Sequence, residues 1–194
     1  GLPADVGVIV MNVTSTAFVG KYLETGMPLV TKRLTVDGDI VKEPKNVEVI
    51  IGTSVQELLD FCGGLTEAPG KVLYGGPMMG IAVPELSEPI LKNTNAILAF
   101  AEEEATLPAS TACIRCGRCI AHCPLRLMPA EVEDAYAAGD VEALLGLKVN
   151  LCMECGCCSY ICPAHRPLVQ TNRLAKAKIA EYRRAQKQKE AVKK

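Results

Sequence analysis

Residues 113–124, CIRCGRCIAHCP, recur 39 positions later as residues 152–163, CMECGCCSYICP. Each copy has the pattern CxxCxxCxxxCP, so eight of the ten cysteines of the chain stand at the motif positions of two short segments. Thiols at this density are typical of a metal centre in a reducing compartment, whereas a disulfide framework disperses its cysteines along the chain. The repeat therefore predicts that this part of the chain is organised around bound metal.

The spacing of the cysteines indicates which metal. CxxCxxCxxxCP is the run that binds [4Fe-4S] clusters in two-cluster ferredoxins, where the fourth cysteine of each run serves the cluster of the other run. Zinc is the alternative, because CxxC pairs also form tetrahedral sites, but zinc needs neither the third cysteine nor the CP ending. The pattern predicts two [4Fe-4S] clusters. The first takes Cys113, Cys116, Cys119 and Cys162, and the second takes Cys152, Cys155, Cys158 and Cys123.

The other two cysteines are predicted not to be ligands. Cys157 stands where the first copy has Arg118, and Cys62 follows an apolar helix end, which suits a packed side chain. Residues 105–194 contain no recognisable nucleophile, general base or substrate pocket, so we expect no catalytic residue there. The doubled motif alone predicts a conduit for single electrons.

Composition limits the class of protein. The 194 residues are 49% hydrophobic and carry a formal net charge of −1, as in soluble globular proteins and unlike disordered chains or nucleic-acid binders. No apolar run approaches the roughly 18 residues of a membrane span, and the start does not resemble a secretory signal. Because the first residue is not Met and an apolar run follows at once, we expect the sequence to be part of a longer protein.

Residues 1–26 are predicted to end an α/β domain. The apolar run 6–11 suggests a buried strand, and a helix is expected to start at Thr14 or Ser15 and to stop at Gly26.

Residues 27–103 alternate short β-rich runs with one helix. The helix is predicted to begin at Ser54, where Glu57 completes a capping box, and to stop at residues 63–64. Several strands around one helix indicate a small α+β unit, of which a β-grasp is one candidate. The expected strands are 29–36, 40–42, 47–51, 71–74, 81–83 and 96–100, with a hairpin signal at Asp37-Gly38.

Beyond residue 102 we expect a linker and then helices between the cysteines. One helix is predicted to start at Pro129 and the next to be capped by Asp140. Residues 171–194 hold nine Lys or Arg against two Glu. This basic tail is expected to be a solvated helix or to attach to an anionic membrane face or an acidic partner.

Together with the doubled cysteine motif, the loop GGPMMG (75–80) and the segment CPAHRPLVQ (162–170) resemble the RnfC family of the Rnf electron transport complex. By itself the loop suggests only a glycine-dense turn, or a surface that packs on a neighbouring subunit. The resemblance implies an overall α+β class and places FMN and NAD in an N-terminal part that this sequence lacks. It implies the end of a Rossmann-like flavin- and NADH-binding domain at 1–26, an SLBB-like β-grasp domain at 27–103, a helical two-[4Fe-4S] ferredoxin-type domain at 108–170 and the basic tail at 171–194.

The same resemblance implies a peripheral subunit at the cytoplasmic face of the cell membrane. It would pass electrons between ferredoxin and NAD in an ion-translocating complex, with the membrane subunits as direct partners, ferredoxin as an indirect one and no nucleic acid. The alternative is an iron–sulfur and flavin cobalamin reductase of a microcompartment, or a subunit of another soluble oxidoreductase.

Overall fold

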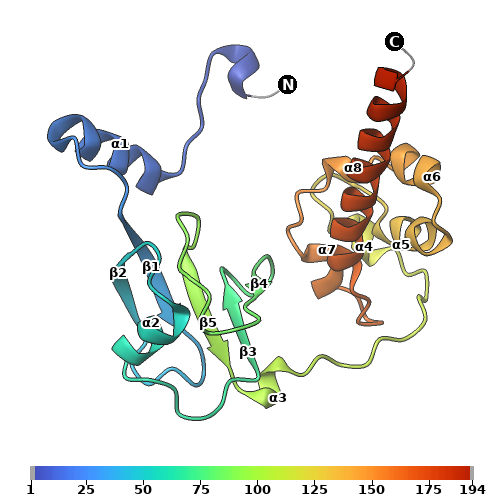
Figure 1. The fold of residues 1–194 in the computed structure, drawn as a ribbon. Coiled ribbons are helices and arrows are strands. Elements are labelled where there is room, and N and C mark those ends of the chain that lie inside the picture. The colour runs from blue at the N-terminus through green and yellow to red at the C-terminus, as the bar shows by residue number, and fades with distance from the viewer. Residues whose placement is uncertain (1–2, 193–194) are drawn as a thin grey trace. The chain divides into compact units, whose positions relative to one another are not determined.

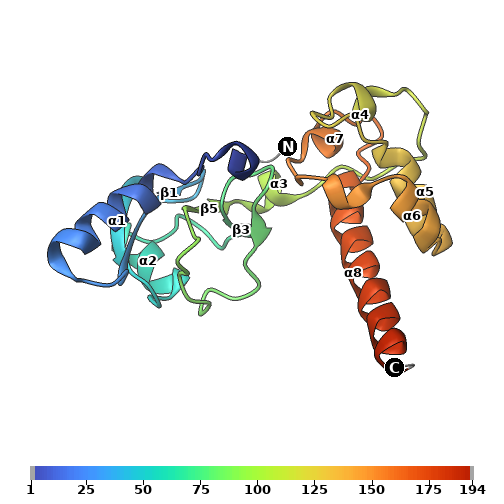
Figure 2. The same ribbon diagram turned by 90° about the horizontal axis from the view of Figure 1, so that it is seen from above.

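The computed structural model describes residues 3–192, which fold into two compact units (Figure 1; Figure 2). The first unit comprises the chain up to residue 75 together with residues 82–101. The second comprises residues 76–81 and the chain from residue 102 onward. The linker expected after residue 102 therefore coincides with the start of the second unit. Within residues 3–192, no helix combines the length and the apolar character needed to cross a bilayer.

The first unit is built on a five-stranded sheet with strand order β2-β1-β5-β3-β4. Its central pair, β1 and β5, is parallel, while β2 pairs antiparallel with β1, and β3 antiparallel with β5. This arrangement agrees with the predicted α+β unit, and five of the six strands expected there lie within two residues of their predicted bounds. The strands are β1 (Thr31–Asp37), β2 (Lys45–Ile50), β3 (Lys71–Tyr74), β4 (Ile81–Ala82) and β5 (Ala96–Phe100).

The helix α2 (Val55–Phe61) starts as predicted. The Ser54 hydroxyl accepts a hydrogen bond from the Glu57 amide (3.2 Å), and the Glu57 carboxylate accepts one from the Ser54 amide (3.0 Å). This capping box satisfies two amides that the first turn leaves free. The buried side chains of α2 join alternate residues of β1 in one apolar core, to which Cys62 belongs as predicted, whereas Phe61 is exposed.

Two predicted strands are wrong. Residues 6–11 form no strand; a short 3-10 helix η1 (Pro3–Val6) and an extended segment lead into α1 (Val13–Thr25). An apolar run becomes a strand only where another strand offers hydrogen bonds, and none in the described chain does so here. The cap of α1 is Asn12, slightly before the predicted start, while Gly26 ends the helix as expected. Residues 40–42 make only an isolated bridge at Val41.

The second unit is helical. Its main core joins α5, α6, η2 and α8, with Val132, Leu144 and Ile179 buried. The helix starts predicted at Pro129 and Asp140 are both confirmed, and the Asp140 carboxylate accepts a hydrogen bond from the Ala143 amide (2.9 Å). The helices are α3 (Glu102–Ala105), α4 (Arg118–Ala121), α5 (Pro129–Ala138), α6 (Val141–Gly146), η2 (Val149–Leu151), α7 (Cys157–Tyr160) and α8 (Leu168–Val192).

Helix α8 crosses residue 170, where the basic tail was expected to begin. Ala175 and Ile179 are buried in the core of the second unit, and Asn172 is 2% exposed. The buried stripe that they form is narrow and partly polar, so the hydropathy pattern of the sequence indicated its burial only weakly. The freely exposed basic part of the helix begins at Arg183.

We predict that Gly38→Ala destabilises the first unit far more than Gly52→Ala. Both glycines have positive φ (+133° and +101°), which costs a side chain about 1–2 kcal/mol, but only at Gly38 would the new Cβ strike the backbone carbonyl of Ala99 in β5. We expect a loss of about 3 kcal/mol or more at Gly38, since overpacking adds to the strain. Urea unfolding followed by hydrogen exchange of the β5 amides measures both; equal losses would contradict the clash.

Candidate metal centres

The cysteine repeat has one backbone fold in both copies. In each, a glycine in the left-handed region, Gly117 or Gly156, starts a short helix, α4 or α7. The amide of the last cysteine then bonds back to the carbonyl three residues earlier, at 3.1 Å for Cys123 and 3.2 Å for Cys162. Positive φ angles recur at equivalent non-glycine residues, which are Arg115 (54°) and Glu154 (58°), and Arg126 (50°) and His165 (49°). Strained backbone of this kind gathers at functional sites.

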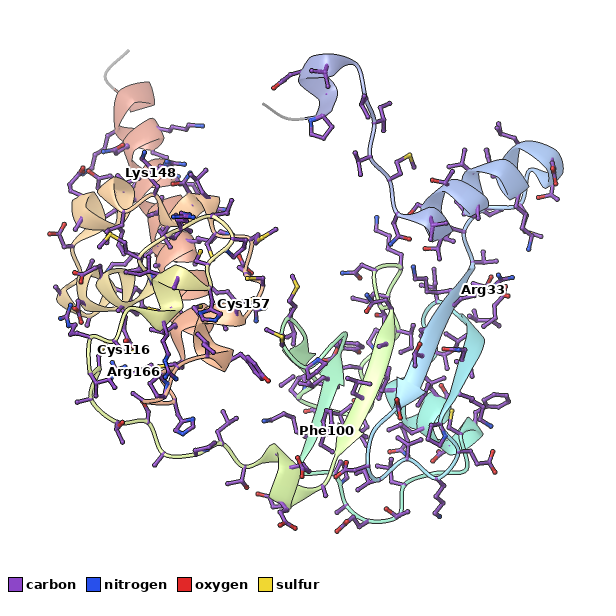
Figure 3. All side chains as sticks on the ribbon, turned by 180° about the vertical axis from the view of Figure 1, so that it is seen from behind. Arg33, Phe100, Cys116, Lys148, Cys157 and Arg166 are labelled. Atoms are coloured by element: carbon purple, nitrogen blue, oxygen red, sulfur yellow. The ribbon has the colours of Figure 1, made fainter. Side chains whose placement is uncertain are left out.

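The first hollow of the second unit brings together four of the predicted ligands. It has a volume of about 220 Å³ and is lined by Cys113, Cys116, Cys119 and Cys162. Arg166 also lines it and is labelled beside Cys116 in Figure 3. Three of these cysteines come from the first copy and one from the second. Cys113 and Cys116 are exposed, so this hollow opens to solvent.

The second hollow brings together the other four. It has a volume of about 20 Å³ and is lined by Cys123, Cys152, Cys155 and Cys158, again three from one copy and one from the other. Burial raises the pKa of the Cys158 thiol to about 11. Cys157 also lines this hollow, and a hydrogen bond with Cys155 raises the pKa of its thiol.

The donors at both hollows suit an iron–sulfur group. Thiolates are the ligands of such clusters, and backbone N–H groups that bond the sulfurs adjust their potentials. At the second hollow, such bonds run from the amide of Leu127 to Cys123 Sγ and from that of Glu154 to Cys152 Sγ, both 3.4 Å. Among the side chains that the structure describes, no three from His, Cys, Asp or Glu converge on a position for a single metal ion.

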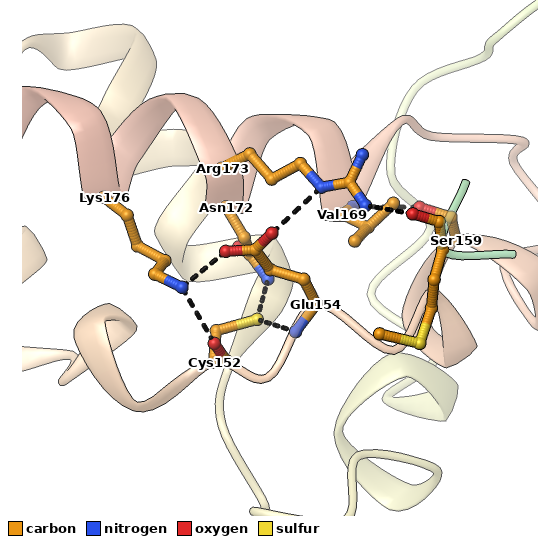
Figure 4. A network of polar contacts seen from close by, with 8 residues as sticks. Cys152, Glu154, Ser159, Val169, Asn172, Arg173 and Lys176 are labelled. Carbon is orange, nitrogen blue, oxygen red and sulfur yellow. Dashed lines mark hydrogen bonds and ion pairs between the residues drawn. The ribbon is translucent and has the colours of Figure 1, made fainter. Parts of the chain in front are cut away.

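A polar network borders the second hollow (Figure 4). The Glu154 carboxylate lies between Arg173, at 3.1 Å, and Lys176, and the hydrogen bond from Lys176 is the largest cause of its lowered pKa. The Lys176 ammonium also donates to the carbonyl of Cys152 (3.1 Å). The side-chain amide of Asn172 lies 3.5 Å from Cys152 Sγ. Helix α8 thus holds the second cysteine loop by three side chains.

The first hollow has a different set of ion pairs. Arg115 binds two carboxylates of α5, Glu131 at 2.7 Å and Asp134 at 2.8 Å, and the pKa of its guanidinium is raised chiefly by Asp134. Arg166 binds Glu133 at 2.8 Å and donates to the Thr111 carbonyl at 3.1 Å.

The GGPMMG loop takes part in the second unit. Residues 76–81 pack there, where the carbonyl of Met79 accepts a hydrogen bond from Arg173 (2.9 Å). A Cβ on Gly156 would lie 2.7 Å from the carbonyl of Met78. The glycine-dense turn that the sequence suggested is present between β3 and β4, closed by a hydrogen bond from the Gly80 amide to the Gly76 carbonyl (2.7 Å). The backbone of this turn contacts the second cysteine loop of its own chain.

Sequence reasoning missed the side chains around the cysteines. No motif marks Glu154, Asn172, Arg173 and Lys176. The available signal was positional, because residues 172, 173 and 176 lie within about one turn of a helix that follows the second CP ending.

Two domain families match the chain. The SLBB domain matches residues 33–82, and the 4Fe-4S dicluster domain matches residues 107–163. The first match falls mainly on the sheet unit and the second covers both cysteine copies. The second unit is therefore an iron–sulfur module.

The chain is also similar to three curated proteins, each of which is the C subunit of its complex. It is 42% identical over 180 residues, 93% of its length, to that of the ion-translocating oxidoreductase complex of Rhodobacter capsulatus. It is 44% identical over 130 residues, 67% of its length, to that of the proton-translocating ferredoxin:NAD(+) oxidoreductase complex of Clostridium ljungdahlii. The protein from the Na(+)-translocating ferredoxin:NAD(+) oxidoreductase complex of Acetobacterium woodii is 41% identical over 133 residues, 69% of the chain. The matches cover 35%, 28% and 30% of those proteins, so the chain spans about a third of their length.

We predict that Gly156→Ala releases the 76–81 loop and that Gly117→Ala does not. Both glycines are in the left-handed region, with φ of 81° and 72°, so the backbone strain of about 1–2 kcal/mol is shared. Only at Gly156 does the added carbon meet the Met78 carbonyl; the space around Gly117 is open. Proteinase K cleavage within residues 76–81 should accelerate in Gly156→Ala alone. Equal acceleration in both variants would mean that strain, not the contact, holds the loop.

Proposed function

The chain belongs to the RnfC family of ion-translocating oxidoreductase complexes, and we propose that it is the part of such a protein that carries electrons on two [4Fe-4S] clusters. One observation carries this proposal. Each of two hollows in the second unit is lined by four of the eight motif cysteines. A [4Fe-4S] cluster, when bound, accepts and releases one electron at a time.

The ligand sets are proposed as the spacing of the cysteines predicted them. Cys113, Cys116, Cys119 and Cys162 hold cluster 1, and Cys152, Cys155, Cys158 and Cys123 hold cluster 2. The linings of the two hollows support this division. The chain contributes thiolates and amide donors, and α5 and α8 fix the loops that carry them.

The complex in which the clusters work is proposed from the relatives. Two of them are named for exchange between ferredoxin and NAD(+), so we place this chain on that route, next to the membrane subunits and at the cytoplasmic face. The names of all three relatives favour this over a cobalamin reductase. FMN and NAD are proposed to bind outside residues 1–194. The reason is that these residues contain no glycine-rich loop of the kind that binds flavin and nicotinamide phosphates in the RnfC family.

Residues 1–26 are proposed to complete the flavin- and NADH-binding domain of the family. The support is the exposure of the described residues 3–26, since α1 has no buried residue and Val6, Ile9 and Val10 are all exposed. Apolar groups gathered in this way mark a surface that another part of a protein covers.

We predict about eight irons per chain after anaerobic reconstitution and a coupled two-cluster EPR spectrum on full reduction. Cys123→Ser should then lose mainly the cluster held by Cys152, Cys155 and Cys158, since a cluster with one missing thiolate is incomplete. Iron quantitation and low-temperature EPR measure both outcomes.

Cys157→Ser is the matched control, because Cys157 lines the same hollow without being a proposed ligand. It should keep both clusters. Loss of iron in this variant equal to that in Cys155→Ser would refute the ligand assignment, and four irons or stoichiometric zinc in the parent chain would refute the two clusters.

We further propose that the end of α8 attaches the chain to an anionic membrane surface. Arg183, Arg184, Lys187 and Lys189 lie on its outer part, and residues 183–194 hold six basic residues against one acidic one. Each basic residue near such a surface contributes about 1 kcal/mol.

Deletion of residues 183–194 should abolish salt-sensitive sedimentation with phosphatidylserine vesicles and leave the iron content unchanged. The cut spares Ala175 and Ile179, which the core needs. Phosphatidylcholine vesicles serve as the control. Because screening acts over about 8 Å at physiological salt, binding that persists at high salt would point to a source other than charge.

A further inference from the structure

The cysteine repeat extends into the helices that follow it. Helix α5 starts at Pro129 and α8 starts at Leu168, which keeps the interval of 39 residues. In both copies, the third residue of the first CxxC pair forms an ion pair with the sixth residue of the following helix, Arg115 with Asp134 and Glu154 with Arg173. The contact is the same and its charges are reversed.

The net charge of the ion-paired side chains therefore differs between the two hollows. At the first, Arg115 and Arg166 face three carboxylates, Glu131, Glu133 and Asp134, which leaves one negative charge in excess. At the second, Arg173 and Lys176 face only Glu154, which leaves one positive charge in excess. Arg118 and Arg126, on either side of Cys123, are exposed to solvent, which screens their charges.

One pair of equivalent residues, of which the first is half-buried and the second is buried, sharpens this contrast. Glu133 of α5 occupies the position of Asn172 in α8. Asn172 is 2% exposed, its amide nitrogen lies 3.5 Å from Cys152 Sγ, and in the described chain no donor reaches its Oδ1. A buried acceptor without a partner costs about 1–3 kcal/mol, so packing alone does not explain an amide here. Its N–H group points at a sulfur, whereas an ionised Glu133 can only accept.

We propose that Asn172 is a positioning residue that, with the positive excess around Glu154, gives cluster 2 the higher reduction potential of the two. Reduction adds one electron and one negative charge to a cluster and breaks no bond. A hydrogen bond to the thiolate and a nearby positive charge both stabilise the reduced form. In the half-reduced protein the electron resides on cluster 2. This inference rests on the proposed ligand sets.

The test is an EPR-monitored potential titration of the reconstituted chain with dithionite. Asn172→Leu removes the donor and keeps the volume, so it should lower the higher of the two midpoints and leave the lower one unchanged. We expect about a tenfold change in the partition of the electron, which is about 59 mV for a one-electron couple. Lys176→Met, at a half-exposed site, should shift the same midpoint in the same direction.

Glu133→Gln is the matched control in the other copy. It removes a negative charge beside cluster 1 and should raise only the lower midpoint. The inference is overturned if Asn172→Leu and Lys176→Met shift the lower midpoint or leave both midpoints unchanged. It is also overturned if Glu133→Gln shifts the higher midpoint. Iron content separates the two proposals, because a variant that keeps eight irons and its spectrum but shows the wrong shift refutes the order of potentials and not the ligand sets.

Discussion

The second unit depends on the exchange of one cysteine between the two copies of its motif. Cys162 lines the hollow of the first copy and Cys123 that of the second, so neither hollow is complete within its own copy. The two loops must therefore fold together, and the helices that follow them must hold both at once. Helix α8 meets this demand by combining a buried stripe, which packs on α5 and α6, with polar side chains that bind the second loop. The charge reversal between the copies leaves this backbone plan intact.

Local chemistry made much of the fold predictable. The capping box at Ser54, the proline at the start of α5 and the cap at Asp140 act within one turn of chain, so sequence alone identified them. The strand predicted at residues 6–11 was wrong because a strand needs a partner strand, and the sequence of the run does not show whether one is present. The burial of the first half of α8 was missed because Thr171, Asn172 and Ala175 interrupt the apolar residues of its buried stripe, and hydropathy scales give these side chains little weight.

The candidate site also has a part that the sequence predicted and a part that it did not. Its cysteines were predicted by spacing, since a cluster requires thiolates at short and fixed intervals. The groups that surround the sulfurs were not, because Asn172 and Lys176 lie well beyond the second motif and only the fold of α8 brings them near Cys152. The contact of the 76–81 loop with Gly156 joins segments far apart along the chain, and no local pattern reports such a pairing.

The cysteines of the two hollows differ in exposure, so they should differ in their sensitivity to oxidation. Oxidation of cysteine to sulfenic and higher acids follows the exposure and the thiolate character of the sulfur. Cys113 and Cys116 are exposed, whereas Cys158 is buried and its raised pKa keeps a free thiol there protonated. Peroxide would therefore reach Cys113 and Cys116 before Cys158. Since Cys162 lines the first hollow although it belongs to the second copy, oxidation of Cys113 or Cys116 would also remove a shared partner of the second copy.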